Sequence, residues 1–207
     1  MHERIIGLYE ENAAAWDEAR GRELQDREWF DRLTALLPAG GSVVDLGCGS
    51  GEPVARYLIE SGYRVTGVDS SPSLIALCRK RFPAQQWLVA DMRKLDVGRR
   101  FDGILAWYSF FHLDFDDQRA MFPRLAAHAA PGAALMFTSG PRHGEAIGEW
   151  QGEPLYHASL APEEYRELLG ANGFAVESFK PGMPIADGPS VWIGLQMSPA
   201  SGLDGSA

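Results

Sequence analysis

The chain has 207 residues, of which 45% are hydrophobic and 23% are charged, and its formal net charge is -9. This length suits one globular domain, and no apolar stretch approaches the roughly 20 residues that a membrane helix requires. Because the negative charge repels nucleic acid backbones and anionic lipids, we expect neither as a partner and favour a small-molecule ligand.

The N-terminal residues show no export signal, and the cysteines show no metal-binding pattern. The first 20 residues mix charges throughout and lack the continuous apolar centre of a secretory signal, so we expect a cytoplasmic protein. Cys48 and Cys78 form neither a Cys-x-x-Cys pair nor a disulfide framework. We therefore expect no metal site.

Residues 1–40 have helical periodicity and precede the first expected strand. Tyr9, Ala13, Trp16 and Arg20 fall at positions i, i+4, i+7 and i+11, so we expect them on one face of a single helix. An arginine on such a face either extends along a packed stripe toward solvent or binds an anionic group.

After residue 41, apolar runs of strand length alternate with segments of helical periodicity. This alternation is typical of right-handed β-α-β units around a buried parallel sheet. Pro123 lies inside one helical segment, which we expect it to kink or divide. The expected strands are 42–46, 63–69, 86–91, 101–107 and 133–139, and the expected helices are about 52–61, 71–81, 116–129 and 162–171.

Two more strands are expected near the C-terminus, at 174–180 and 191–196. Their connection is rich in glycine and proline and too short for a crossover helix, so the pair should be antiparallel. The polar residues 198–207 are expected to form a disordered tail. The sequence thus predicts one core domain over 41–197, with 1–40 as an N-terminal helical segment of the same domain.

A glycine-rich loop, "DLGCGSG" at 45–51, follows the first expected strand. Gly47, Gly49 and Gly51 permit positive φ angles and let a ligand approach the backbone closely. A dinucleotide fingerprint requires glycine where Glu52 stands, and that charge would face a pyrophosphate at the helix start. The loop also lacks the Gly-Lys-Ser/Thr of a phosphate-binding P-loop, so the sequence disfavours NAD and nucleoside triphosphates.

Polar and aromatic residues follow the next expected strands, at the edge of the sheet where ligands bind in open α/β folds. Asp69, followed by Ser70, either binds sugar hydroxyls or caps the next helix. Asp91 ends the third strand. The aromatic run "AWYSFFHL" at 106–113 ends the fourth.

The sequence resembles the class I S-adenosylmethionine-dependent methyltransferases that act on small molecules. The resemblance lies in the pattern acid-x-Gly-x-Gly-x-Gly and in the segments "VTGVDSS", "VADM" and "FDGILAWYSFFHL". The resemblance covers most of 42–140. It implies an α/β, Rossmann-like, doubly wound sheet of seven mainly parallel strands with an antiparallel last strand, preceded by an N-terminal helical lid. It also implies S-adenosylmethionine as cofactor, S-adenosylhomocysteine as product, and a small-molecule O, N or S acceptor for a monomer or homodimer.

The resemblance also implies roles for the residues noted above. Asp45 would lie near the ammonium and sulfonium, Asp69 and Ser70 at the ribose, and Asp91 at the adenine amino group. Met92 would contact the adenine ring, unless Asp91 and Met92 are a turn and a core residue. The other implied cofactor-binding residues are Gly47, Cys48, Gly49 and Gly51 in the loop, Trp107 beside the sulfonium, Arg20 at the carboxylate, and Tyr9 and Trp16 in the lid.

The long connection 139–160 is expected to form a wall for the methyl acceptor. His112, His143 and His157 are candidate catalytic bases, although a histidine at a strand end is also common as a structural residue. Methyl transfer is a one-step displacement, so alignment of the acceptor and exclusion of water matter more than a base.

Two alternatives remain at this point: a protein that binds S-adenosylmethionine without transfer, and another nucleoside-dependent transferase, such as an aminopropyl transferase. The family's DNA enzymes carry an Asn/Asp-Pro-Pro-aromatic motif after the fourth strand, where this chain has "WYSF". This difference further disfavours a nucleic acid substrate.

Overall fold

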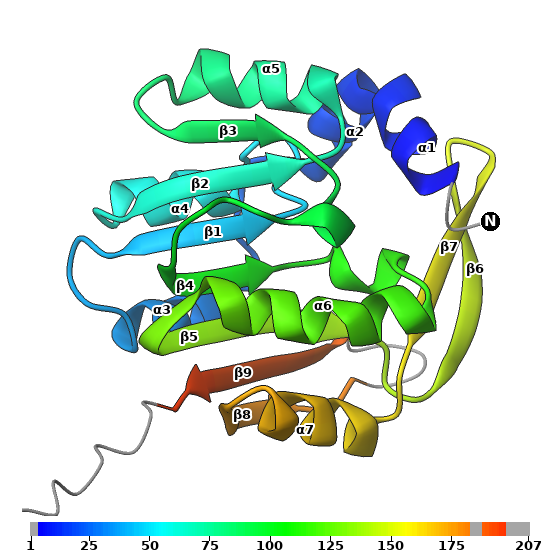
Figure 1. Ribbon diagram of the computed structural model, residues 1–207. Helices are drawn as coiled ribbons and strands as arrows, with labels where there is room; N and C mark the ends of the chain where they lie inside the picture. The colour runs from blue at the N-terminus through cyan, green and yellow to red at the C-terminus, as the bar shows by residue number, and fades with distance from the viewer. Residues whose placement is uncertain (1–3, 183–187, 198–207) are drawn as a thin grey trace, which may run out of the picture.

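A computed structural model describes residues 4–182 and 188–197, and in it helices cover both faces of a seven-stranded sheet (Figure 1). The strand order is β3-β2-β1-β4-β5-β9-β8. The expected tail, 198–207, lies outside the described residues. The strands of this sheet are β1 Ser42–Leu46, β2 Arg64–Asp69, β3 Gln86–Val89, β4 Phe101–Ala106, β5 Ala129–Ser139, β8 Phe174–Lys180 and β9 Ser190–Gln196.

The first five strands of the sheet run parallel, whereas β9 is antiparallel to both of its neighbours, β5 and β8. The predicted mainly parallel sheet with an antiparallel last strand is therefore confirmed. Chain order reverses between β1 and β4, and this is the point where ligands bind in open α/β sheets.

The helices are α1 Ile5–Glu11, α2 Ala13–Arg20, α3 Arg27–Ala35, α4 Val54–Glu60, α5 Pro72–Arg81, α6 Phe115–His128 and α7 Pro162–Ala171, with 3-10 helices η2 Met92–Lys94 and η3 Phe110–His112.

The central strands are apolar because both of their faces are covered. All five residues of β1 are buried. Figure 1 shows α6 and α7 on the front face and α3 and α4 behind the sheet. Phe30 of α3 packs into the core on one face, and Phe122 of α6 packs into the core on the other. These two apolar layers hold the strand ends that form the site.

The proline inside α6 does not divide that helix. Pro123 lies within one continuous helix of 14 residues, so of the two expected outcomes, a kink or a division, the division does not occur. Proline removes one backbone hydrogen bond from a helix interior. The burial of Met121, Phe122 and Leu125 on the sheet stabilises the helix across this position.

The segment 139–160, for which the sequence predicts a long connection and no strands, contains a β-hairpin. Its strands are β6 Gly144–Trp150 and β7 Glu153–Ser159, which pair in antiparallel register. Gln151 and Gly152 form the turn with φ angles of 53° and 80°. Two positive φ angles are typical of the type I′ turn, whose twist matches that of a hairpin. Figure 1 shows this hairpin beyond the carboxyl ends of the parallel strands.

The N-terminal segment forms two helices instead of the single helix that its periodicity predicts. The break falls at Asn12, whose side-chain amide donates a 2.9 Å hydrogen bond to the carbonyl of Leu8. Asparagine competes for backbone hydrogen bonds in this way and lowers helix stability. Tyr9 and Trp16 therefore lie on different helices, but their rings still contact each other at 6.2 Å between centroids.

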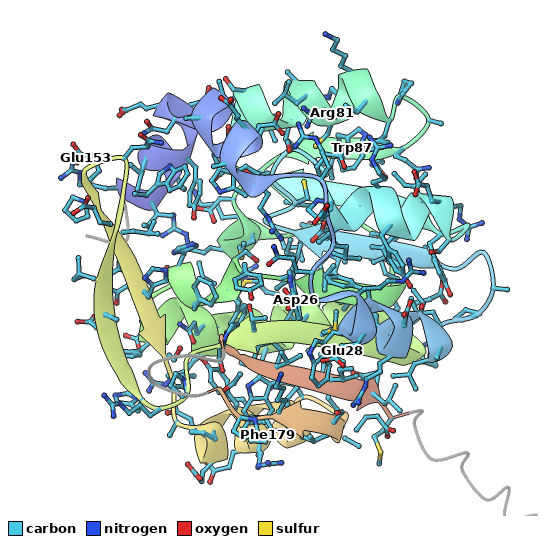
Figure 2. All side chains as sticks on the ribbon, turned by 180° about the vertical axis from the view of Figure 1, so that it is seen from behind. Asp26, Glu28, Arg81, Trp87, Glu153 and Phe179 are labelled. Carbon is cyan, nitrogen blue, oxygen red and sulfur yellow. The ribbon has the colours of Figure 1, made fainter. Side chains whose placement is uncertain are left out.

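Polar contacts attach both N-terminal helices to α5. Glu10 of α1 accepts hydrogen bonds from the hydroxyls of Ser71 and Ser73 at the start of α5. Asp17 of α2 accepts hydrogen bonds from Arg81 at the end of α5, at 2.6 and 2.7 Å. At the hairpin tip, Glu153 pairs with Arg4 at 3.3 Å; Figure 2 shows Glu153 beside the N-terminal helices.

The ion pair between Asp17 and Arg81 is mostly withdrawn from solvent. The side chain of Asp17 is 12% exposed and that of Arg81 is 21% exposed. Hydrogen bonds from Arg81 hold the pKa of Asp17 well below its usual range, although burial opposes them. A carboxyl whose pKa falls on folding stabilises the folded state above its unfolded pKa of about 3.9 and loses this effect as pH falls.

We expect Asp17→Asn to lower the free energy of unfolding by about 2 kcal/mol at pH 7, because it leaves Arg81 without its charged partner. Urea unfolding measures this difference, which should shrink below a pH of about 4, because the unfolded chain then takes up a proton at Asp17 while the native carboxyl is still ionised. Glu18→Gln, at an exposed position of the same helix, is the matched control. Equal stability of the two variants at pH 7 would show that this ion pair does not anchor α2.

Candidate functional site

A cavity of about 560 Å³ lies at the carboxyl ends of β1, β2 and β4, between the N-terminal helices, η3 and the hairpin. Its volume is in the usual range for small-molecule sites. Most of the residues singled out from the sequence line it: Tyr9, Trp16, Arg20, Asp45, Gly47, Cys48, Gly49, Asp69, Ser70, Asp91, Met92, Trp107, His112 and His157.

Gly51 and His143 do not line this cavity. Gly51 approaches the ring of Phe82, which a Cβ at position 51 would meet at 3.0 Å. His143 stacks on Phe115, with 4.6 Å between ring centroids and an interplanar angle of 19°. Both residues therefore pack against protein outside the cavity.

Two glycines of the loop allow close approach of protein side chains. A Cβ on Gly47 would lie 2.4 Å from the Cβ of Ser109, and one on Gly49 would lie 2.4 Å from the ring of Trp16. Both glycines also have positive φ angles, 75° and 56°. Any other residue at Gly49 would displace Trp16, so the loop and the helix above it depend on each other.

Two carboxylates come from the ends of adjacent strands. Asp45 is 3% exposed, and burial, with the nearby charge of Asp69, raises its pKa to about 7 against the opposing charge of Arg20. Asp69 accepts hydrogen bonds from the amides of Gly49 and Ser71, at 2.8 and 2.9 Å. Burial also raises the pKa of Asp69, although these hydrogen bonds oppose the rise. A cationic ligand would relieve the repulsion between the two carboxylates.

Arg20 brings a positive charge to the same part of the cavity. Its guanidinium lies 5.9 Å from the centre of the Tyr108 ring. Among residues 4–182 and 188–197, no carboxylate lies within ion-pair distance of it. An unpaired guanidinium near the acidic group Asp45 suits a ligand that carries both a carboxylate and an ammonium.

Asp91 and Met92 lie at the start of η2. Arg93 donates hydrogen bonds to both carboxylate oxygens of Asp91, at 3.0 and 2.9 Å, and also contacts Asp117 at 3.2 Å. Burial raises the pKa of Asp91, but these bonds outweigh it and hold the pKa below its usual value. Sequence reasoning missed Arg93, although it stands only two residues after Asp91.

The opposite wall of the cavity contains a histidine with a defined tautomer. His112 Nδ1 lies 2.9 Å from the carbonyl oxygen of Tyr156, which accepts only, so Nδ1 carries the proton. Nε2 then accepts a hydrogen bond from the hydroxyl of Tyr9, also at 2.9 Å. Burial lowers the pKa of His112 to about 4, so the ring is neutral at pH 7. His157 stands beside it, with 4.9 Å between ring centroids.

Neither a metal centre nor a membrane helix is found in the part of the chain that the structure describes. No three histidine, cysteine or acidic side chains there are arranged to hold a metal ion. No helix within the described ranges is both long and apolar enough to span a bilayer.

Known proteins with similar sequences include a trans-aconitate 2-methyltransferase of Methylobacterium nodulans, 31% identical over 81% of this chain and 72% of its own length. The chain spans only about half the length of the first curated relatives that it matches, from 38% to 61%.

Solved structures share the fold at low sequence identity. The CcbJ methyltransferase from Streptomyces caelestis aligns with a TM-score of 0.72 over 90% of this chain and 96% of its own, at 19% identity. The 1,6-didemethyltoxoflavin-N1-methyltransferase of Burkholderia thailandensis aligns with a TM-score of 0.69 over 95% of this chain and 90% of its own, at 23% identity.

The family described as a methyltransferase domain matches residues 17–178, which include the glycine loop, the strand-end carboxylates and the hairpin. This match covers most of the chain. The chain therefore belongs to the methyltransferase domain family.

Proposed function

We propose that this protein transfers the methyl group of S-adenosylmethionine to the O, N or S atom of a small molecule. The main support for the proposal is the charge pattern of the cavity, in which Asp45 and Asp69 lie near Arg20, whose guanidinium has no ion-pair partner within residues 4–182 and 188–197. The cofactor carries a sulfonium, an ammonium and a carboxylate, so its charges complement these three side chains. Related solved structures hold S-adenosylmethionine or S-adenosylhomocysteine, which supports this choice.

The cavity residues fit the parts of this cofactor. Asp69 keeps acceptor capacity for ribose hydroxyls after its two backbone hydrogen bonds, because each carboxylate oxygen accepts more than one. Asp91 likewise accepts from the adenine amino group beside Met92. Trp107 lines the cavity, and its buried indole N–H has no acceptor among the described residues, so a ligand oxygen there would satisfy it.

The remaining cofactor assignments follow the same arrangement. Ser70 borders the ribose, the backbone of Gly47 and Gly49 borders the methionine portion, and Cys48 lies against the loop. The cavity gives no such role to Gly51 or His143. Trp16 and Tyr9 cover the loop from above, and we propose that they act as a lid.

The bound cofactor supplies an electrophilic methyl group, and the protein's own residues align the acceptor, exclude water and accept its proton. The walls hold the acceptor in line with the methyl group, which lowers the barrier through proximity, and the N-terminal helices exclude water. The neutral His112 and the hydroxyl of Tyr9 form a proton path, in which Tyr9 receives the acceptor's proton while it donates its own to Nε2. His157 orients the acceptor beside this pair.

The relatives and neighbours are named for methyl transfer to different small molecules, including trans-aconitate, amino sugars and a toxoflavin precursor. This range favours methyl transfer over aminopropyl transfer. The proton path of Tyr9 and His112 also favours an enzyme over a protein that only binds the cofactor, because binding requires no base.

The direct test is calorimetric titration of the protein with S-adenosylhomocysteine and with NAD. We expect S-adenosylhomocysteine to bind and NAD not to bind, because buried Glu52 lines the cavity where a pyrophosphate would approach. Methyl transfer from labelled S-adenosylmethionine to a panel of phenols, amines, thiols and carboxylates tests the reaction. Binding of NAD without any response to S-adenosylhomocysteine would overturn the proposal.

The raised pKa of Asp45 predicts that affinity depends on pH. Because the cofactor's ammonium favours the ionised carboxylate, binding of S-adenosylhomocysteine should strengthen about tenfold per pH unit from pH 5.5 toward 7 and then level off. Asp45→Asn should bind more weakly with a flatter pH profile, because the carboxyl whose pKa lies near 7 is removed. The opposite sign applies to the contribution of Asp45 to the stability of the ligand-free protein, which should become less favourable as pH rises from about 4 to about 7. A constant affinity over this range would contradict the role of Asp45.

Arg20 is tested with two ligands that differ in the amino acid portion. We expect Arg20→Met to weaken S-adenosylhomocysteine binding by about tenfold, because one charged hydrogen-bonded pair is lost. Binding of methylthioadenosine, which lacks the carboxylate, should change less than twofold. If calorimetry shows that both ligands weaken equally, Arg20 acts only on the packing of α2.

A further inference from the structure

The wall of the cavity opposite the strand ends has a composition of its own. We call it the acceptor wall, the cavity-lining residues supplied by α1, η3 and the hairpin, which include Ile6, Tyr9, Phe111, His112, Trp150 and His157. Every charged residue that lines the cavity comes from other elements, so the acceptor wall carries no formal charge while His112 is neutral.

Ring contacts organise the acceptor wall. Phe111 lies 5.1 Å from His157 and 4.9 Å from His112, measured between ring centroids. The ring of Tyr9, on α1, lies 5.5 Å from the ring of His112, measured between centroids. Burial also lowers the pKa of His157, which favours its neutral form. A cluster of neutral rings favours contact with a flat ring over contact with a flexible or strongly hydrated molecule.

Anionic acceptors find no partner on this wall. The two arginines that line the cavity are Arg20, which the proposed function assigns to the cofactor carboxylate, and Arg93, which Asp91 and Asp117 already pair. A tricarboxylate would lose its hydration against aromatic rings without gaining a cation. A sugar presents many hydroxyls, which the few polar atoms of the acceptor wall cannot all satisfy.

One polar atom of the wall lacks a partner. The indole Nε1 of Trp150 is buried, and no acceptor for its proton is found among the residues that the structure describes. Trp150 lines the cavity at the end of β6, beside the hairpin turn. A buried donor without an acceptor is costly, and a ligand carbonyl or ring nitrogen would satisfy it.

We propose that the methyl acceptor is a flat, uncharged aromatic or heteroaromatic molecule, held by the rings of Phe111 and His157, whose carbonyl or ring nitrogen accepts the Nε1–H of Trp150 and whose acidic hydroxyl or ring N–H is methylated. This proposal rests on the proposed function and narrows it to one class of acceptor.

For a hydroxyl acceptor, the transfer is a single displacement in which one bond forms, one bond breaks and one proton leaves the acceptor. Its oxygen forms the bond to the methyl carbon, the bond from that carbon to sulfur breaks, and the electron pair stays on sulfur. The acceptor's proton passes through Tyr9 to Nε2 of His112 and then to water. A weak base such as neutral His112 suits an acidic aromatic hydroxyl better than an aliphatic alcohol, because the difference in acidity is smaller.

The first experiment measures binding to the protein saturated with S-adenosylhomocysteine. Umbelliferone is flat and carries both a ring carbonyl and an acidic hydroxyl, and we expect calorimetry to show at least tenfold tighter binding for it than for trans-aconitate or glucosamine. Equal or tighter binding of either of those two would overturn the proposal. Failure of S-adenosylhomocysteine itself to bind would instead overturn the proposed function, so the two failures are distinguishable.

The second experiment tests the role of Trp150 with a matched pair of ligands. Trp150→Phe keeps an aromatic ring and removes the N–H, so the Kd of umbelliferone should rise about fivefold. The Kd of β-naphthol, which lacks the carbonyl, should change less than twofold. Ile147→Ser, at an exposed position of β6 outside the cavity, is the control and should change neither value. If Trp150→Phe shifts both ligands equally, or neither, the proposed hydrogen bond is wrong.

Discussion

Two carboxylates at the ends of β1 and β2 repel each other, and the surrounding groups must stabilise their ionised forms. Asp45 and Asp69 stand on adjacent parallel strands, withdrawn from water, and the pKa of both is raised. Backbone amides of the glycine loop and of the start of α5 stabilise Asp69. The ionised form of Asp45 is stabilised less, because Arg20 acts on it only through its charge. A cation bound beside these carboxylates would favour the ionised form of Asp45.

The N-terminal helices contact the same elements that carry this charge. Asp69 orients the amide of Gly49, Trp16 occupies the space above Gly49, and Asp17, one residue further, pairs with Arg81 of α5. The loop, the N-terminal helices and the α5 helix are therefore connected by direct contacts. A ligand at Asp69 would contact the same loop that packs against Trp16.

The sequence predicts the fold and the residues that line the cavity at the strand ends because their signals are local. Strand periodicity gives the parallel sheet, and the spacing of Asp45, the glycines and Asp69 gives the position of the loop. The sequence does not reveal that Ser109 and Trp16 fill the space beside Gly47 and Gly49, since these contacts join distant segments. It also predicts one N-terminal helix where the local hydrogen bond of Asn12 divides two.

The acceptor half is harder to predict, for a physical reason. The hairpin β6-β7 keeps most of β6 exposed, so it lacks the alternation of buried and exposed residues that identifies a strand. Its turn is Gln151-Gly152 instead of the more recognisable Asn-Gly. The hairpin also brings His157 to His112 across 45 residues of chain, which no spacing rule anticipates. The residues that we propose to bind the cofactor lie mostly at the edge of the sheet, whereas those that we propose to contact the acceptor lie largely on η3 and the hairpin, so a change in the hairpin would alter acceptor choice without disturbing Asp45 or Asp69.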